Sequence, residues 1–261
     1  ALEELDFSMS IEYGYLEDPA LGNYGAEMLA AWEGLESIER LILSGNHLST
    51  GGISALLSSP HLCKLKALAL REIQTATFFL STFENAHADL TLDVLDLAGN
   101  WALYINQNSF RNARCLHQLK KLDLSNCELN DNALQALADS PGVGQLRMLD
   151  LLWNNIEEEG LIQLLGAEPR LLHTLNLSHN ELSTKAVRAI ASSSTLTSLR
   201  SLDLSYNEME REAIEQLGAT EHLPELQVLE LYHCGPDEQT VTDFTSSPLA
   251  NRLARLEISI A

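Results

Sequence analysis

The chain has 261 residues, 45% of them hydrophobic, and its 37 acidic and 16 basic residues give a formal net charge of −21. This surplus of negative charge disfavours binding to a nucleic-acid phosphate backbone or to an anionic membrane surface. It favours a basic protein or peptide as the partner, unless the charge serves only to keep the chain in solution.

A phrase of the form LxxLxLxx recurs along the whole chain. The spacing is 36 residues once and then 27, with a single step of 26, and the phrases begin at Leu2, Ile38, Leu65, Leu92, Leu119, Leu146, Leu172, Leu199, Leu226 and Leu253. A period of this length is typical of a solenoid, in which each unit packs only on its neighbours. We therefore predict one domain over residues 1–261 with about ten 27-residue repeats, of which the first, residues 1–37, is longer and atypical.

Each phrase predicts one short strand, because its fourth and sixth residues point inward and flank an outward residue. Stacked parallel strands would join these inward residues into one core. The ninth position holds a small polar residue in seven repeats, namely Asn46, Asn100, Asn154, Asn180 and Asn207, with Cys127 and Cys234 in their place twice. We expect these side chains to hydrogen-bond the backbone of the turn that leaves the strand.

After the turn, apolar residues three apart recur at a constant offset from the strand, which predicts a helix. The pairs are Ile53/Leu56, Leu134/Leu137, Leu161/Leu164, Val187/Ile190, Ile214/Leu217 and Val241/Phe244. Asp131, Glu158 and Thr184 stand near the expected helix starts. Since a helix is wider than a strand, a stack of such units bends, with the strands on its concave side.

The phrases LDLAGN, LDLSNC, LDLLWN, LNLSHN and LDLSYN follow the pattern LxxLxLxx(N/C), and the period leaves room for a full helix. In these motifs the chain resembles leucine-rich repeat proteins of the ribonuclease-inhibitor-like type, and runs such as SSPHLCKLKALAL resemble bacterial tandem-repeat members. The resemblance implies an α/β fold, a right-handed curved solenoid with parallel strands on the concave face and helices on the convex face. It also implies protein binding without catalysis.

Two regions depart from the pattern. The segment 11–37 carries an aromatic and acidic insertion, including Tyr13, Tyr15 and Tyr24, which we expect either to shield the first edge or to extend the binding face. Repeats three and four contain extra aromatic residues, most of which we expect to pack on the convex side: Phe78, Phe79, Phe83, Trp101, Tyr104 and Phe110.

The fifth position of the phrase should face the concave side and forms an acidic stripe. In chain order it reads Asp6, Ile42, Ala69, Asp96, Asp123, Asp150, Asn176, Asp203, Glu230 and Glu257. Neighbouring members lie about 4.8 Å apart if the strands are paired. The stripe is either a docking track for lysine and arginine side chains or simply reflects the residues that are common at this position of such repeats.

The eighth position carries a ring in four consecutive repeats: Trp153, His179, Tyr206 and His233. Leu152 and Tyr232 stand beside them at the seventh position, which we also expect to face the concave side. Rings of this kind are favoured anchors of protein interfaces, but they can equally stack on one another and cover their own turns. We predict a partner-binding surface made of Asp96, Asp123, Asp150, Leu152, Trp153, His179, Asp203, Tyr206, Glu230, Tyr232 and His233.

Signals for chemistry are weak, and we predict that the chain is not an enzyme and holds no cofactor or metal. His179 and His233 are two repeats apart, roughly 10 Å, which is too far for one tetrahedral metal site. Serines at the seventh position lack a histidine in a triad-like arrangement, and no glycine-rich phosphate loop is present. The main functional prediction is a protein-interaction scaffold, and the alternative is the substrate-recognition portion of a larger enzyme or effector.

Cysteine usage and the chain ends bear on compartment and context. Cys63 and Cys115 fall two repeats apart and Cys127 and Cys234 four, so neither pair should form a disulfide. With no basic-then-apolar leader and no apolar run near 18 residues, we predict a cytoplasmic location without a membrane span. Because both ends fall on a repeat phrase, we also predict a fragment of a longer chain, with weak self-association through its end repeats.

Overall fold

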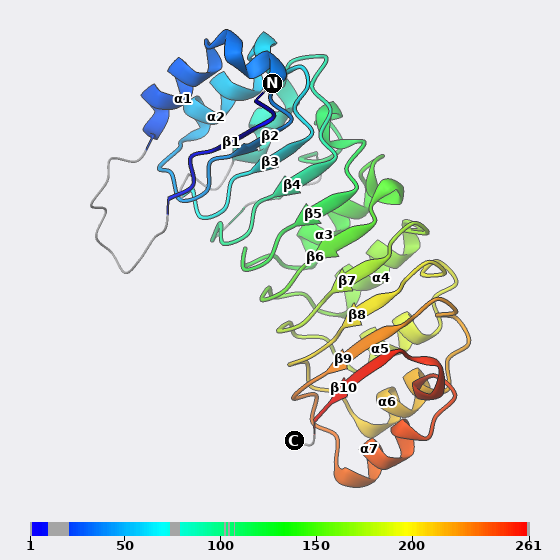
Figure 1. The fold of residues 1–261 in the computed structure, drawn as a ribbon. Coiled ribbons are helices and arrows are strands. Elements are labelled where there is room, and N and C mark those ends of the chain that lie inside the picture. Colours follow the sequence, from blue (N-terminus) through cyan, green and yellow to red (C-terminus); the bar gives the residue numbers. More distant parts are fainter. Residues whose placement is uncertain are drawn as a thin grey trace.

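The fold is a stack of short parallel strands. The structure, a computed structural model, describes residues 2–9, 21–73, 79–101, 103, 105–106 and 108–259. Its strands form one sheet in chain order, in which every neighbouring pair is parallel (Figure 1). The strands are β1 (Glu4–Asp6), β2 (Arg40–Ile42), β3 (Ala67–Ala69), β4 (Val94–Asp96), β5 (Lys121–Asp123), β6 (Met148–Asp150), β7 (Thr174–Asn176), β8 (Ser201–Asp203), β9 (Val228–Leu231) and β10 (Arg255–Ile258).

The register of the sheet follows the repeat. Each strand begins at the third residue of its phrase, and equivalent positions pair across every step, as in Leu122 with Leu149 and Leu149 with Leu175. These fourth-position leucines are buried, so the predicted apolar row is a continuous core. The expected curved α/β leucine-rich repeat solenoid is confirmed.

The ninth-position asparagines form a buried ladder, as the sequence predicts. Asn154 Nδ2 donates to the carbonyl oxygens of Leu124 and Leu151 at 2.9 and 3.0 Å, and its Oδ1 accepts from the amide of Leu129 at 2.8 Å. Cys127 replaces asparagine by placing its Sγ 3.2 Å from the Leu97 carbonyl oxygen. Burial raises the pKa of the Cys127 thiol to about 12, so it keeps the proton that this contact needs.

Helices cover one side of the sheet (Figure 1). The α-helices of the described residues are α1 (Gly22–Ala30), α2 (Thr50–Leu57), α3 (Asp131–Ala138), α4 (Glu158–Gly166), α5 (Thr184–Ala191), α6 (Arg211–Gly218) and α7 (Glu238–Thr245). The three expected starts are the first helical residues of α3, α4 and α5, one position after the cap. Five of the six expected apolar pairs are buried, whereas in α7 Val241 is half-buried and Thr240 takes the core position.

Short 3-10 turns complete the repeats: η1 (Glu33–Ser37), η2 (Pro60–Leu62), η3 (Phe79–Asn85), η4 (Arg114–Leu116), η5 (Val143–Gln145) and η6 (Ala250–Arg252). In repeat three, η3 stands where most repeats have an α-helix. In repeat four, the described residues at that place form turns, and η4 stands where repeat two has η2. Repeat three keeps the apolar pair at this offset, as the buried Leu80 and Phe83, whereas repeat four has Gln107 in place of the first apolar residue.

The extra aromatic residues divide into buried and exposed groups. Phe83 and Phe110 are buried, as expected. Trp101 is 71% exposed, so a packing role for it was wrong: the preceding Asn100 is drawn into the ladder, which directs the next side chain outward. Tyr24 lies exposed on α1. The remaining predictions about aromatic residues fall on residues outside the described ranges, namely Tyr13, Tyr15, Phe78 and Tyr104. The side chain of Phe79 is also outside the described part.

None of the helices in the described ranges combines the length and the apolar character needed to cross a bilayer.

Candidate functional site

The acidic stripe lies on the strand face, and arginines of this chain pair with Asp96 and Asp123 and with its last two members, Glu230 and Glu257. Strand pairing places Asp96, Asp123 and Asp150 on neighbouring strands in register. Arg71 reaches over the first two: its Nε lies 2.5 Å from Asp96 Oδ2, and its Nη2 lies 3.0 Å from Asp123 Oδ2. At the other end, Arg255 pairs with Glu230 and Glu257, each at 3.1 Å. These contacts leave the middle of the stripe available to a partner.

The middle of the stripe consists of Asp150, Asn176 and Asp203, and among the described residues neither aspartate has a cationic partner. Asn176 Nδ2 donates to Asp150 Oδ2 at 3.3 Å. Burial raises the pKa of Asp150, the Leu152 amide acts against it, and the negative charge of Asp123 adds to the rise. An added cation would therefore relieve both the desolvation and the repulsion.

The four rings at the eighth position occupy a turn with an unusual backbone. Trp153, His179, Tyr206 and His233 have φ angles of 54°, 51°, 57° and 48°, the left-handed region. Of the earlier repeats, three place Gly45, Gly99 and Asn126 there, residue types that adopt this conformation at low cost, and repeat three places Glu72 there at φ 49°. The turn is held by the backbone, since the amides of Trp153 and His179 donate to the carbonyl oxygens of Ser178 and Ser205.

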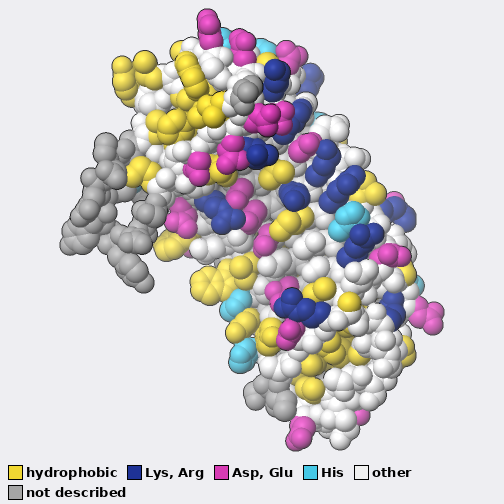
Figure 2. Space-filling model, viewed as in Figure 1, with side chains coloured by type: hydrophobic (Ala, Val, Ile, Leu, Met, Phe, Trp, Pro, Cys, Tyr) yellow, Lys and Arg dark blue, Asp and Glu magenta, His cyan; other side chains and the backbone are white. Residues whose placement is uncertain are grey.

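These rings form one continuous column, the ring ladder. Ring centroids are 5.2 Å apart for Trp153 and His179, 3.8 Å for His179 and Tyr206, and 4.8 Å for Tyr206 and His233. The middle contact is a parallel stack, with 13° between the ring planes. Trp153 remains 55% exposed and Tyr206 45%. In Figure 2 hydrophobic and histidine side chains alternate along the left edge of the molecule.

The seventh position contributes less than the sequence suggests. Leu152 and Tyr232 are half-buried beside the ladder. The Tyr232 hydroxyl donates to Glu257 Oε2 at 2.6 Å, which raises the pKa of Tyr232 and ties this ring to the Arg255 cluster. Ser178 and Ser205 are buried rather than facing solvent, because their hydroxyls bond within the sheet to Asn176 Oδ1 and the Tyr232 amide.

A shallow groove of about 430 Å³ runs along the ladder on its turn side. Trp153, His179 and Tyr206 line it, and Glu128 and Glu181, at the tenth position of their phrases, supply carboxylates. The two glutamates are not among the site residues predicted from the sequence, because their tenth position follows the strand. The glycines and the asparagine at the eighth position of other repeats do indicate a tight turn, and this turn brings the tenth position close to the rings.

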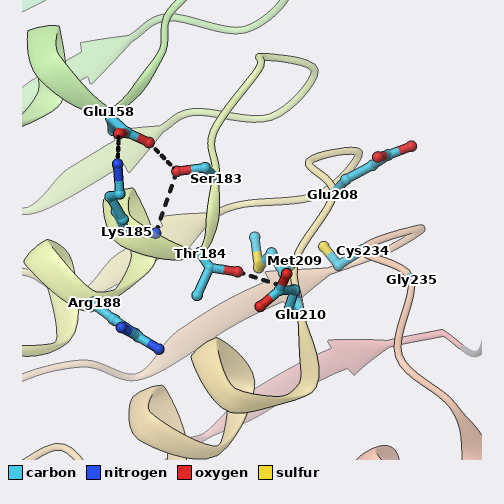
Figure 3. A pocket seen from close by; sticks show the side chains of 10 residues that line it. All are labelled: Glu158, Ser183, Thr184, Lys185, Arg188, Glu208, Met209, Glu210, Cys234 and Gly235. Atoms are coloured by element: carbon cyan, nitrogen blue, oxygen red, sulfur yellow. Dashed lines mark hydrogen bonds and ion pairs between the residues drawn. The ribbon is translucent and has the colours of Figure 1, made fainter.

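A larger cavity, of about 730 Å³, lies beside α5 (Figure 3). Its two cations are already paired: Lys185 Nζ lies 2.7 Å from Glu158 Oε1, and the Ser183 hydroxyl bonds the same carboxylate. Arg188 pairs with Glu212 at 2.5 Å. A polar ligand would have to break these contacts, so this cavity is the weaker candidate.

The residue just before the strand, at the opposite edge of the strand face, is a cation in four of the ten repeats and acidic in three, as Glu3, Glu39 and Asp93. Lys66, Lys120, Arg147 and Arg200 hold the second position of their phrases and are exposed. Backbone hydrogen bonds join this position from strand to strand, for example from Arg147 to Lys120. Figure 2 shows lysine and arginine side chains spread across this side. The strand face is therefore polar across its width, with cations at one edge and free carboxylates toward the rings.

The structure thus divides the predicted site residues. It brings together the ring ladder with Asp150, Asp203 and Leu152, while Asp96 and Asp123 are bound by Arg71, and Glu230 and Tyr232 belong to the Arg255 cluster. Within the described ranges, no group of three or more histidine, cysteine or acidic residues has a metal-binding arrangement.

Comparisons with known proteins point to one kind of repeat. A family model described as "Leucine Rich repeat" matches residues 34–57, 116–138, 169–191 and 195–218. No curated protein matches the chain. Among solved structures, the crystal structure of a TLR13–ssRNA13 complex is similar, with 20% sequence identity and a TM-score of 0.55, over 87% of this chain and 33% of the TLR13 chain. The chain therefore spans about a third of that relative's length, and at this identity the likeness shows the fold alone.

Proposed function

Because this chain is a leucine-rich repeat protein, we propose that it is a non-catalytic interaction scaffold that binds a basic protein or peptide over strands β6 to β9. Solenoids of this kind present an extended surface made of equivalent positions of successive repeats. The single observation that carries the proposal is the ring ladder, with its left-handed backbone and its exposed rings.

Stability alone does not account for the ladder. A side chain in the left-handed region costs roughly 1–2 kcal/mol per residue. One ring contact returns about 0.5–1.5 kcal/mol. At the middle of these ranges, the three contacts between the rings return only about half of the free energy that the four strained residues cost. Glycine or asparagine, used at the same turn in three of the earlier repeats, would serve stability at least as well, and strain of this kind is typical of binding sites.

Charge supports a basic partner. Asp150 and Asp203 lie on the strand side of the ladder without cationic partners among the described residues, and the whole chain carries a net charge of −21. A partner that inserts lysine or arginine side chains between them would gain hydrogen bonds to ionised groups, while the rings would bury its apolar surface.

The test uses two pairs of substitutions. A partner is first captured from native extract and purified, and its affinity is then measured for the wild type, Trp153→Ala/Tyr206→Ala and Asp150→Asn/Asp203→Asn. Since central aromatic anchors carry much of the binding energy, we expect the ring pair to weaken binding by about 2 kcal/mol or more, roughly 30-fold. The aspartate pair should weaken it mainly at low salt.

A matched control separates the site from general surface effects. Trp101 and Tyr24 are exposed aromatic residues outside the site, so Trp101→Ala/Tyr24→Ala should leave the affinity unchanged. Equal losses in the control and in the ring pair, or an unchanged affinity in the ring pair, would contradict the proposal.

Three further predictions about partners and context remain. Recognition of a substrate on behalf of a catalytic domain elsewhere in a longer protein would use the same surface, and the full reading frame tests it. The exclusion of nucleic acid also stays a prediction, which a single-stranded RNA added to the binding assay checks. Weak self-association through the end repeats predicts a molar mass that rises with concentration in light scattering.

A further inference from the structure

The groove on the turn side of the ring ladder has the chemistry of a socket for one side chain. We propose that it binds the guanidinium group of a single arginine, which deepens the proposed function by naming the residue of the basic partner that enters here. The inference rests on that function, because the arginine would belong to the same partner. Its carboxylates, however, are different from the aspartates of the acidic stripe.

The indole of Trp153 gives the socket its electron-rich face, because the stacked rings of His179 and Tyr206 cover each other's faces. Trp153, His179 and Tyr206 all line the groove, and the edge-to-face contact between Trp153 and His179, at 74°, turns the indole plane away from the plane of the stacked pair. The groove is thus bounded by rings in two orientations. A cation within about 6 Å of a ring centroid is attracted by the negative face of the ring, most strongly for tryptophan.

The carboxylates give the socket its charge. Glu128 and Glu181 are both exposed, and neither side chain has an ion pair or hydrogen bond among the described residues. Lysine and arginine are absent from the described lining of the groove, whose other members are asparagines. The charge of the groove is therefore uncompensated within the chain, unlike that of the cavity beside α5, where lysine and glutamate neutralise each other.

The shape of the site favours guanidinium over ammonium. A guanidinium group is planar, stacks on aromatic rings and donates two parallel hydrogen bonds to a carboxylate. It is also more weakly hydrated than an ammonium group, so it loses less when it enters a groove that stays open to water. A lysine ammonium is compact and strongly hydrated, and neither ring stacking nor paired hydrogen bonds are open to it.

The experiment needs no natural partner. The probes are N-acetyl-arginine amide, the corresponding lysine amide and the corresponding citrulline amide, which keeps the planar shape of arginine without its charge. Binding is followed by NMR on the indole N–H signals, since the chain has three tryptophans and Trp32 and Trp101 lie outside the groove and serve as internal references. Trp153→Phe assigns the third signal.

We expect a saturable shift of the Trp153 signal with the arginine probe, an affinity at least threefold weaker for the lysine probe, and no saturable shift with citrulline. Glu128→Gln/Glu181→Gln should weaken arginine binding at least fivefold. The matched control, Glu221→Gln/Glu225→Gln, removes the same charge from exposed positions outside the groove and should have little effect.

Three results would overturn the socket: no saturable shift at Trp153, equal responses to arginine and citrulline, or equal weakening by the two glutamine pairs. The outcome is separate from that of the proposed function. If Glu128→Gln/Glu181→Gln keeps full partner affinity while Trp153→Ala/Tyr206→Ala loses it, the scaffold stands and the socket fails. If the arginine probe binds but no partner depends on the rings, the proposed function fails instead.

Discussion

Single polar side chains hold this fold together where the backbone turns. Asn154 is buried and satisfies backbone groups of two neighbouring repeats, with its Oδ1 accepting from Cys127 and Leu129 and its Nδ2 donating to Leu124 and Leu151. The hydrogen bonds of a buried asparagine add little net stability, since they replace bonds to water. Removing the side chain is costly, because its backbone partners stay buried without hydrogen bonds.

We expect Asn154→Ala to lower the free energy of unfolding by about 3 kcal/mol, because each orphaned buried group costs roughly 1–3 kcal/mol. Urea unfolding measures the change. Asn154→Cys should cost less, since Cys127 and Cys234 fill equivalent positions with a weak donor. Asn155→Ala, at the exposed neighbouring position, is the control. A loss of stability as large as that of Asn154→Ala would argue against the hydrogen bonds of the buried asparagine as the cause.

At Asp150, the charge that the proposed binding needs lowers the stability of the folded protein. Burial raises its pKa above the usual 3.8, so the folded protein holds the proton more readily than the unfolded chain. Its favourable contribution is fully present below pH 3.8 and is lost as the pH rises through the raised folded pKa. At neutral pH the carboxylate therefore costs stability.

We expect Asp150→Asn to raise the free energy of unfolding by roughly 0.5 kcal/mol at neutral pH. The amide keeps an oxygen to accept from the Leu152 amide and loses only the long 3.3 Å bond from Asn176 Nδ2, and Asn176 already occupies the equivalent position of the next repeat. Urea unfolding of this variant beside Glu225→Gln, an exposed charge removal, measures the effect. A variant less stable than the wild type would contradict a cost of burying this charge.

At the scale of the element, the ring ladder joins four turns into one unit. Each ring contacts the ring of the next repeat, and the backbone continues the hydrogen bonds of the sheet as far as the third residue past the strand, which fixes the turns. His179 stands between Trp153 and Tyr206, so its protonation state affects the whole column. Burial lowers its pKa and the charge of His233 adds to this, whereas Asp203 acts in the opposite direction.

The ladder should therefore weaken in acid. Because the pKa of His179 is lowered in the folded protein, the unfolded chain binds the proton more readily. The stabilising contribution of neutral His179 is therefore fully present above pH 6.5 and is lost as the pH falls through the folded pKa. We expect the melting temperature to fall less for His179→Gln than for the wild type between about pH 7 and about pH 5. His222→Gln, at an exposed site outside the ladder, should keep the wild-type slope, and equal slopes in all three proteins would refute the idea.

At the scale of the whole molecule, the proposed binding has two sources, the net charge and the contact surface of the rings. The net charge of −21 creates a long-range field, whereas the rings act only on contact. Salt screens the field over roughly 10 Å at about 0.1 M. The two contributions should therefore separate in the kinetics of association and dissociation.

We expect the association rate of a basic partner to fall about tenfold between about 50 and about 500 mM NaCl, with a smaller change in the dissociation rate. Trp153→Ala/Tyr206→Ala should change the association rate little and increase the dissociation rate. Surface plasmon resonance at several salt concentrations measures both rates. An association rate independent of salt would show that the net charge does not steer the encounter.

The sequence alone predicts the repeat, the strands, their register and the buried asparagines, because these follow from periodicity and from contacts that every repeat makes in the same way. The placing of the rings and carboxylates on one surface also follows from the period, but their states do not. Arg71 neutralises Asp123 from a position 52 residues away, and Arg255 does the same at the other end of the stripe.

Only the tertiary structure decided which carboxylates stay free, that the rings stack in a left-handed turn, and that Glu128 and Glu181 join them across a groove. The physical reason is that such pairings depend on side-chain reach and rotamer across several repeats, whereas periodicity specifies only the direction in which each residue leaves the backbone.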